Sequence, residues 1–110
     1  MKIAIPLSEF RENSSIADSF GRAKFFLIID SSSQDKQLIQ NPYSESQGGA
    51  GLKTAQLMID HHVDTLLSPR VGQKAHSVLR LANVKVFLTQ SILVDEMIQA
   101  WAAGRLPADQ

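Results

Sequence analysis

The residue types best suited to binding a ligand occur together in one stretch, Gln47-Gly48-Gly49-Ala50-Gly51-Leu52-Lys53. Glycine lets main-chain N–H groups approach a ligand closely, because no Cβ stands in the way. Apolar residues at helical spacing follow, so a helix should begin here and contribute unpaired donors and a partial positive charge. The stretch therefore indicates a cradle for an anion. Taken alone, the stretch is better explained as a flexible loop followed by an ordinary helix start than as an anion cradle.

Known nucleotide-binding motifs do not explain this stretch. A P-loop needs glycine directly before Lys-Thr, and Leu52 occupies that position before Lys53. The dinucleotide fingerprint G-x-G-x-x-G also fails, because Thr54 stands where its third glycine belongs. Neither motif supports nucleotide binding.

Four cationic residues accompany the glycine-bearing loops, namely Arg22, Lys24, Arg70 and Lys74. Arg22 and Arg70 are the better anion donors, since a guanidinium group is planar and forked. Each one alone is most simply a solvated side chain. Four of them near one edge of a protein without net charge favour a local anion site.

Catalytic and metal-binding constellations are not apparent. The sequence has no cysteine, which excludes disulfides, thiolate catalysis and cysteine-ligated metals. His61 and His62 are adjacent and would point about 100° apart on a helix, so they do not chelate one ion easily. We expect a structural role for them and for His76, although His76 is the nearest candidate for a metal ligand. We expect no enzyme activity.

Composition indicates one globular domain spanning residues 1–110. Lys plus Arg equals Asp plus Glu at 11 each, and a general nucleic-acid or membrane-surface binder would carry a basic excess. The apolar run after Met1 is too short for a signal peptide, and no stretch is long enough to span a membrane. We therefore expect a soluble cytoplasmic protein with neither nucleic-acid nor membrane partners.

The order of elements predicts how the loops are placed. Apolar, β-branched runs predict strands at residues 2–7, 24–30, 36–40, 65–67 and 84–88. Apolar residues at helical spacing predict helices at residues 51–61 and 72–82, with Asn83 as a left-handed cap. A third helix is expected after Ser91 as its cap, with Asp95 and Glu96 in its first turn, and ends at Gly104 and Pro107.

The first three strands have no helix between them, so antiparallel pairing is expected. Right-handed crossovers then make the first, fourth and fifth strands parallel. Their carboxyl ends share one edge with the loops at residues 19–22, 47–53, 68–73 and 89–91, and three helix N-termini point there. Ligands of open α/β sheets bind at this edge. Several glycine-bearing loops that converge there are a stronger signal than any single loop.

Four segments occur in an order and spacing that resemble a known family. They are Ser19-Phe20-Gly21-Arg22 before residues 24–30, Gly48-Gly49-Ala50-Gly51, residues 63–67 followed by residues 71–75, and residues 82–88. The set resembles the dinitrogenase iron–molybdenum cofactor biosynthesis family, the NifX-like accessory domains, over nearly the whole chain. The resemblance implies a ribonuclease-H-like α/β/α sandwich with a five-stranded mixed sheet of order 3-2-1-4-5, strand 2 antiparallel, and three helices.

The resemblance also implies a function: non-enzymatic binding, carriage or assembly of an anionic molybdenum-containing metal–sulfur cluster, held without covalent bonds. Relatives hold iron–molybdenum cofactor precursors or, in the orange-protein type, a molybdenum–copper sulfide cluster. Family members commonly have histidine before Phe-Gly-Arg, where this chain has Ser19, so a possible metal ligand is missing. With no cysteine either, the cluster's own sulfides must satisfy its metals.

The predicted cradle draws on three loops, with Arg22, Arg70 and Lys74 neutralising the cluster and Phe20 shielding one face from water. Its residues are Ser19, Phe20, Gly21, Arg22, Gly48, Gly49, Ala50, Gly51, Arg70, Val71, Gly72, Gln73 and Lys74. Expected partners are the cluster and proteins that assemble or accept it. Two alternatives remain open. One is a protein-interaction or regulatory module of cluster assembly or redox metabolism that binds no cluster, and the other is a site for a phosphate-bearing metabolite.

Overall fold

The computed structural model describes residues 1–89 and 93–106. Strands and helices follow the expected order, with bounds that shift by one or two residues from those expected. They are β1 (Lys2–Leu7), β2 (Phe25–Asp30), β3 (Lys36–Gln40), α1 (Ala50–Asp60), β4 (Thr65–Ser68), α2 (Gln73–Leu81), β5 (Lys85–Leu88) and α3 (Val94–Ala102).

The five strands form one mixed sheet in the order β3-β2-β1-β4-β5. β1 is central, and it pairs antiparallel with β2 and parallel with β4. One row across the sheet shows the register: Ala4 lies opposite Ile28 on β2 and Leu66 on β4, and Leu66 lies opposite Val86 on β5. The expected strand order and directions are confirmed, and the carboxyl ends of β1, β4 and β5 share one edge.

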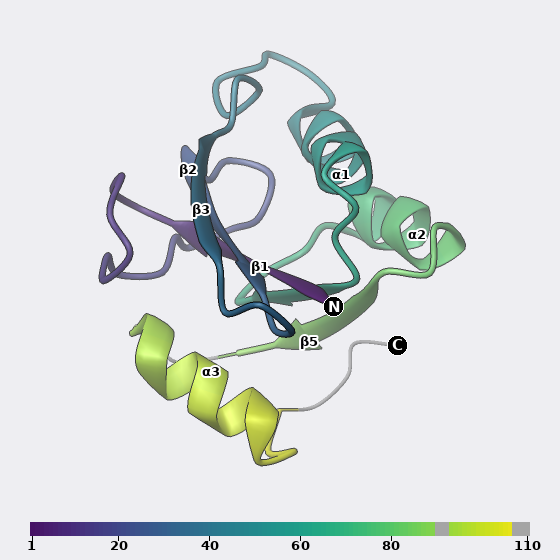
Figure 1. The fold of residues 1–110 in the computed structure, drawn as a ribbon. Helices are drawn as coiled ribbons and strands as arrows, with labels where there is room; N and C mark the ends of the chain where they lie inside the picture. Colours follow the sequence, from purple (N-terminus) through teal and green to yellow (C-terminus); the bar gives the residue numbers. More distant parts are fainter. Residues whose placement is uncertain (90–92, 107–110) are drawn as a thin grey trace.

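Helices cover both faces of the sheet (Figure 1), because the strand residues alternate between two hydrophobic clusters. Phe26 and Ile28 of β2 pack beneath α1 and α2 with Met58 and Leu79. Leu27 of β2 faces the opposite side, in the cluster that contains Met97 of α3 and the partly buried Trp101. The described part of the chain is thus the expected ribonuclease-H-like α/β/α sandwich with three helices.

Each of the three described helices ends at a residue with left-handed backbone conformation. Asn83 has a φ of 64° after α2, as expected, and His62 has a φ of 59° after α1. Gly104 has a φ of 71° after α3. In the α2 ending, Val84 N donates to Leu79 O at 2.9 Å, which satisfies a carbonyl of the last turn.

The first turns of the helices differ in charge. Asp95 and Glu96 lie in the first turn of α3, as expected, and complement the positive end of the helix dipole. Neither α1 nor α2 has an acidic residue in its first turn. The N-cap of α3 is Leu93, so the expectation of Ser91 as the cap was wrong. Ser91 itself and Pro107, the expected stop, lie outside the described residues.

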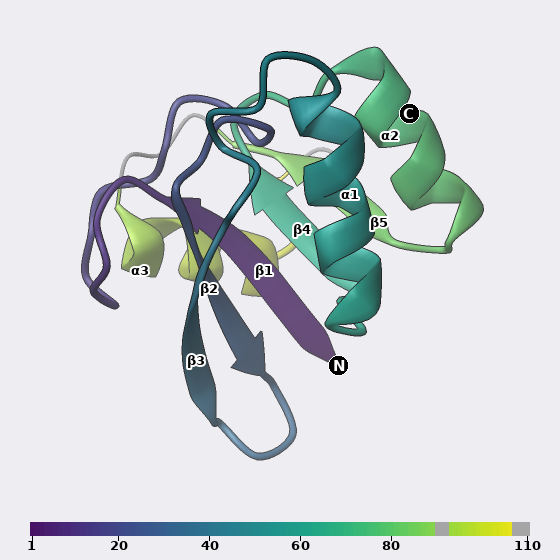
Figure 2. The same ribbon diagram turned by 90° about the horizontal axis from the view of Figure 1, so that it is seen from above.

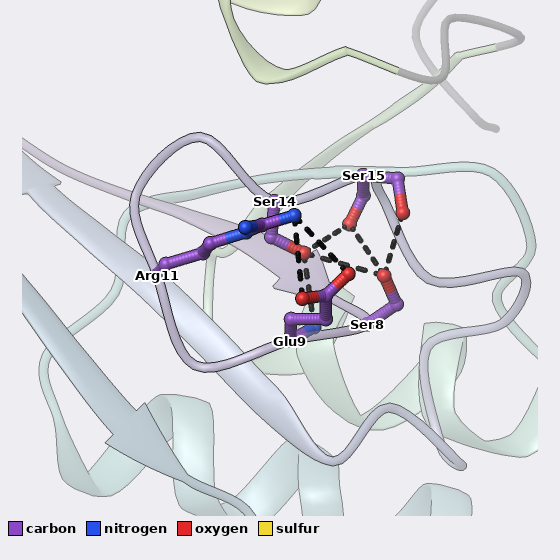
Figure 3. A network of polar contacts seen from close by, with 5 residues as sticks. All are labelled: Ser8, Glu9, Arg11, Ser14 and Ser15. Carbon is purple, nitrogen blue, oxygen red and sulfur yellow. Dashed lines mark hydrogen bonds and ion pairs between the residues drawn. The ribbon is translucent and has the colours of Figure 1, made fainter.

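The loop between β1 and β2 is folded back on itself by serine side chains (Figure 3). Ser14 is fully buried, and its Oγ accepts a hydrogen bond from Glu9 N at 2.9 Å and donates to Ser15 O at 2.7 Å. The hydroxyl oxygens of Ser8 and Ser15 are 2.6 Å apart. Ala17 N then donates to Pro6 O at 3.0 Å, so the loop returns to the end of β1 just before residues 19–22.

Candidate anion-binding site

A hollow of 560 Å³ lies at the carboxyl edge of the sheet, where the β1–β2 loop meets the beginnings of α1 and α2. Figure 2 shows these two helices side by side, entered from the same end of the sheet. Three of the four loops expected there line the hollow, and the fourth, at residues 89–91, lies mostly outside the described residues. The lining residues are Ser19, Gly21, Arg22, Gly49, Ala50, Gly51, Leu52, Arg70, Gly72, Gln73, Lys74 and Ala75.

Two glycines allow the β1–β2 loop to touch the start of α1. A Cβ placed on Gly21 would lie 2.9 Å from Gly51 Cα and 3.0 Å from Gly51 N, closer than real Cβ atoms come. A Cβ on Gly51 would in turn lie 3.5 Å from Ala75 Cβ on α2. Gly21 therefore sets how closely the β1–β2 loop approaches α1, whereas the 3.5 Å distance at Gly51 is an ordinary van der Waals contact.

The N-termini of α1 and α2 both present main-chain N–H groups at this hollow. The first bonds within the helices run from Lys53 N to Gly49 O and from His76 N to Gly72 O, each at 2.9 Å. The first-turn N–H groups before Lys53 and before His76 therefore have no carbonyl acceptor within their own helices. In the described structure neither helix has a side chain that caps them. Two bare, positively polarised helix ends thus flank one space.

Cationic side chains complete the lining. Arg70 and Lys74 are exposed residues next to and within the first turn of α2, and Arg22 is an exposed residue of the β1–β2 loop. No Asp or Glu is among the described lining residues. Lys24, the fourth expected cation, lines a smaller adjoining hollow of 350 Å³, together with Asp18. The lining of the main hollow therefore carries positive charge and no acidic residue, whereas the adjoining hollow, which shares Ser19 and Arg22 with it, includes Asp18.

Several predicted site residues lie elsewhere. Phe20 is 1% exposed and packs edge-to-face on Phe26 in the core, so its side chain does not line the hollow. Its main chain still contributes, because Phe20 N donates to Arg70 O at 2.9 Å and ties two of the loops together. Val71 packs against the same core, and Gly48 is exposed outside the lining. His76 follows the first turn of α2 and is not a lining residue.

Sequence reasoning did not include four residues that shape the site. Leu52 and Ala75 line the hollow, and their places in the first turns of α1 and α2 were the available signal. Buried Asn41 and Thr54 lie beneath it: Asn41 Nδ2 donates to Thr54 Oγ1 at 3.1 Å, and Thr54 Oγ1 donates to Gly21 O at 3.3 Å. A polar residue at an apolar helical position was the only hint of Thr54.

The arrangement can bind an anion through N–H donors and cationic side chains, and it offers no set of metal ligands. Within residues 1–89 and 93–106, no group of three or more His, Asp or Glu residues is placed to hold a metal ion, and the sequence has no cysteine. In the same residues, no helix combines the length and the apolar character needed to cross a membrane.

The fold and the hollow define a class: small α/β domains whose carboxyl edge presents two bare helix N-termini beside a cluster of cations. A family model described as dinitrogenase iron-molybdenum cofactor matches residues 1–104 of this chain. The chain belongs to that family, as the four sequence segments had indicated. Membership connects the protein with the dinitrogenase iron–molybdenum cofactor.

Similar proteins span almost the full chain. An uncharacterised protein of Methanocaldococcus jannaschii is 28% identical over 109 residues, covering 96% of this chain and 89% of that protein. The apo form of the orange protein from Desulfovibrio gigas has a TM-score of 0.92 at 25% identity, covering 98% of this chain and 92% of that one. A putative NifB protein from Thermotoga has a TM-score of 0.85 at 32% identity, covering 97% and 91%.

Proposed function

We propose that this protein binds and carries an anionic metal–sulfur cluster at the hollow between α1 and α2, and that it catalyses no reaction. The cargo would be an iron–molybdenum cofactor precursor or a molybdenum–copper sulfide cluster. The observation that carries the proposal is the pairing of two uncapped helix N-termini across one hollow. Its partners would be proteins that assemble the cluster or accept it.

The donors at the hollow suit a cluster whose metals are already coordinated. Sulfide at the surface of such a cluster accepts hydrogen bonds, and N–H groups at a helix start are aimed to donate them. Arg70 and Lys74 then offset the negative charge, in a site without an acidic lining residue. A bare metal ion would find neither thiolate nor a carboxylate–imidazole group there. This favours a preformed anionic cluster over free metal.

Helix polarity supports binding at the N-termini of α1 and α2 and not at the N-terminus of α3. The N-terminus of α3 carries Asp95 and Glu96, which would repel an anion. The N-termini of α1 and α2 have no such acid, so their partial positive charge is available to a ligand. The cargo would therefore bind on the face of the sheet that α1 and α2 cover.

Anaerobic incubation of the full chain with tetrathiomolybdate, with and without copper(I), tests the proposal. After gel filtration, metal analysis and a visible spectrum should show stoichiometric molybdenum and a charge-transfer band, both reduced at high salt because exposed charges are screened. The double variant Arg70→Ala with Lys74→Ala should lose most of the uptake. Arg80→Ala with Lys85→Ala removes the same charge from exposed positions outside the hollow and should retain it.

Equal uptake by the two double variants would contradict binding at this hollow. Absence of uptake by the wild type, with tetrathiomolybdate and with copper, would favour the protein-interaction module instead, and co-purification with a partner would then identify it. Phosphate found in the purified protein would indicate the phosphate-bearing metabolite.

A further inference from the structure

Arg22 links two loops that are far apart in the sequence. Its Nη1 donates to the main-chain carbonyl of Ser46 at 2.6 Å and to that of Ser44 at 3.2 Å. The residue also lines the main hollow and the smaller adjoining one. Its side chain therefore stands on the wall of the site while it holds the loop that leads into α1.

The loop from Asn41 to Gly49 depends on few other attachments. At its start, Asn41 is firmly fixed, since its main-chain N donates to Lys24 O and its Nδ2 to Ala23 O, each at 2.8 Å. Between residues 42 and 48, however, the two bonds from Arg22 are the only hydrogen bonds to another segment within the described structure. Beyond that stretch, Gly49 caps α1 with a left-handed φ of 71°.

The order of attachments shows what Arg22 controls. Ser46 lies three residues before Gly49, so fixing its carbonyl limits where the cap and the first turn of α1 are placed. A loop without this attachment would have the freedom of an exposed turn, and the N–H groups of Ala50 and Gly51 would sample orientations away from the hollow. Preorganised donors bind an anion better, because the cost of ordering them is met before the ligand arrives.

We propose that Arg22 is a positioning residue: its guanidinium latches the loop of residues 42–48 and thereby holds the start of α1 at the hollow. This inference rests on the proposed function for its second half, the effect on cargo. A guanidinium has five donors, and the two observed bonds use Nη1, so Nε and Nη2 remain to contact an anion. Arg22 then connects cargo and loop directly.

Thermodynamic linkage gives the latch a second consequence. If the latched loop raises the affinity for the cargo, then bound cargo must favour the latched loop by the same factor. Residues 43–47 do not line the hollow, yet cargo binding should reduce the mobility of their backbone. The exposed loop would thus differ between the empty and the loaded protein, at a distance from the cargo itself.

Amide hydrogen exchange, measured by NMR on the full chain without cargo, tests the latch. The probes are the amides of Tyr43 and Ser46, which donate to Asn41 Oδ1 at 3.0 Å and to Tyr43 O at 3.1 Å. Arg22→Ala should speed their exchange about tenfold, the factor expected for one net hydrogen bond to a charged group. Arg70→Ala removes the same charge from the hollow and should leave both amides unchanged. Exchange of Ile28 in β2 serves as the reference for intact folding.

A second arm adds tetrathiomolybdate. Loading should slow exchange at Tyr43 and Ser46 further in the wild type and should fail to do so in Arg22→Ala. If the amides of Tyr43 and Ser46 exchanged at similar rates in Arg22→Ala and Arg70→Ala without cargo, the latch would be overturned, whatever the protein binds. A wild type that takes up no cluster would instead refute the proposed function and leave the first arm to decide the latch alone. Loading that slows these amides equally in both proteins would overturn the coupling.

Discussion

Gly21 and Gly51 meet main chain to main chain, at a distance that leaves no room for a side chain on Gly21. A Cβ there would lie 2.9 Å from Gly51 Cα. The contact joins the β1–β2 loop to the first turn of α1, and Thr54, one turn further along the helix, donates to the carbonyl of the same Gly21 at 3.3 Å. This small area of contact therefore helps to position the start of α1, together with the attachment that Arg22 gives to the preceding loop.

Gly21→Ala should lower the free energy of unfolding by about 1–3 kcal/mol, because the new Cβ must push the backbone of α1 aside. Urea unfolding measures this change. Gly48→Ala is the matched control, since a Cβ on Gly48 meets nothing within 4 Å. Its stability should stay the same or rise by about 0.4–1 kcal/mol, through the lower entropy of the unfolded chain. Equal losses in the two variants would show that the glycine contact does not set the packing.

Gln73→Glu should change stability and cargo binding in opposite directions. Gln73 begins α2 and lines the hollow. A carboxylate in the first turn complements the helix dipole and should raise the free energy of unfolding by about 0.3–1 kcal/mol. The same charge would repel an anion in the hollow, so uptake of tetrathiomolybdate should fall. Thermal unfolding and metal analysis are the two measurements.

Gln99→Glu makes the same chemical change on α3, outside its first turn and outside the hollow. It should not reproduce the pair of opposite effects. If Gln73→Glu weakened neither uptake nor its salt dependence, the start of α2 would not take part in binding.

Thr54→Val should destabilise the protein by about 1–3 kcal/mol, although the two side chains have nearly the same shape. Thr54 is fully buried, and its hydroxyl serves both Asn41 Nδ2 and Gly21 O. Valine would leave those groups with one partner fewer, and the bond lost by Asn41 Nδ2 is buried. Ser77→Ala removes an exposed hydroxyl that donates to Gln73 O at 3.0 Å, and it should cost much less. Chemical denaturation of both variants measures the two losses in the free energy of unfolding. Losses of similar size would rule out a stabilising role for the buried network.

The sequence contained most of the fold because its local signals agree. Apolar, β-branched runs at residues 2–7 and 24–30 indicated strands, and they pair with Ala4 opposite Ile28 as two antiparallel neighbours should. Asn83, at the end of a helical repeat, indicated the left-handed cap that the structure shows. These features depend on short stretches of chain, where steric rules and periodicity apply directly.

The details of the site depend on contacts between distant segments, and these could not be predicted. Phe20 lies in a loop without periodicity, so nothing local showed that its ring would pack on Phe26 in the core. Arg22 was expected to act by its charge, whereas its Nη1 bonds to carbonyls 22 and 24 residues further on. Leu52 was not among the predicted cradle residues, although it lines the hollow.

The most direct test of the central claim is the mapping of amide chemical shifts as tetrathiomolybdate is added anaerobically to the uniformly ¹⁵N-labelled protein. The account predicts the largest changes at the N–H groups that begin two helices, Ala50, Gly51 and Leu52 on α1 and Gln73, Lys74 and Ala75 on α2. The N–H groups of Asp95 and Glu96, at the acidic start of α3, should change little. Changes centred on α3, or spread evenly over exposed lysines and arginines, would contradict a cluster site at the paired helix ends.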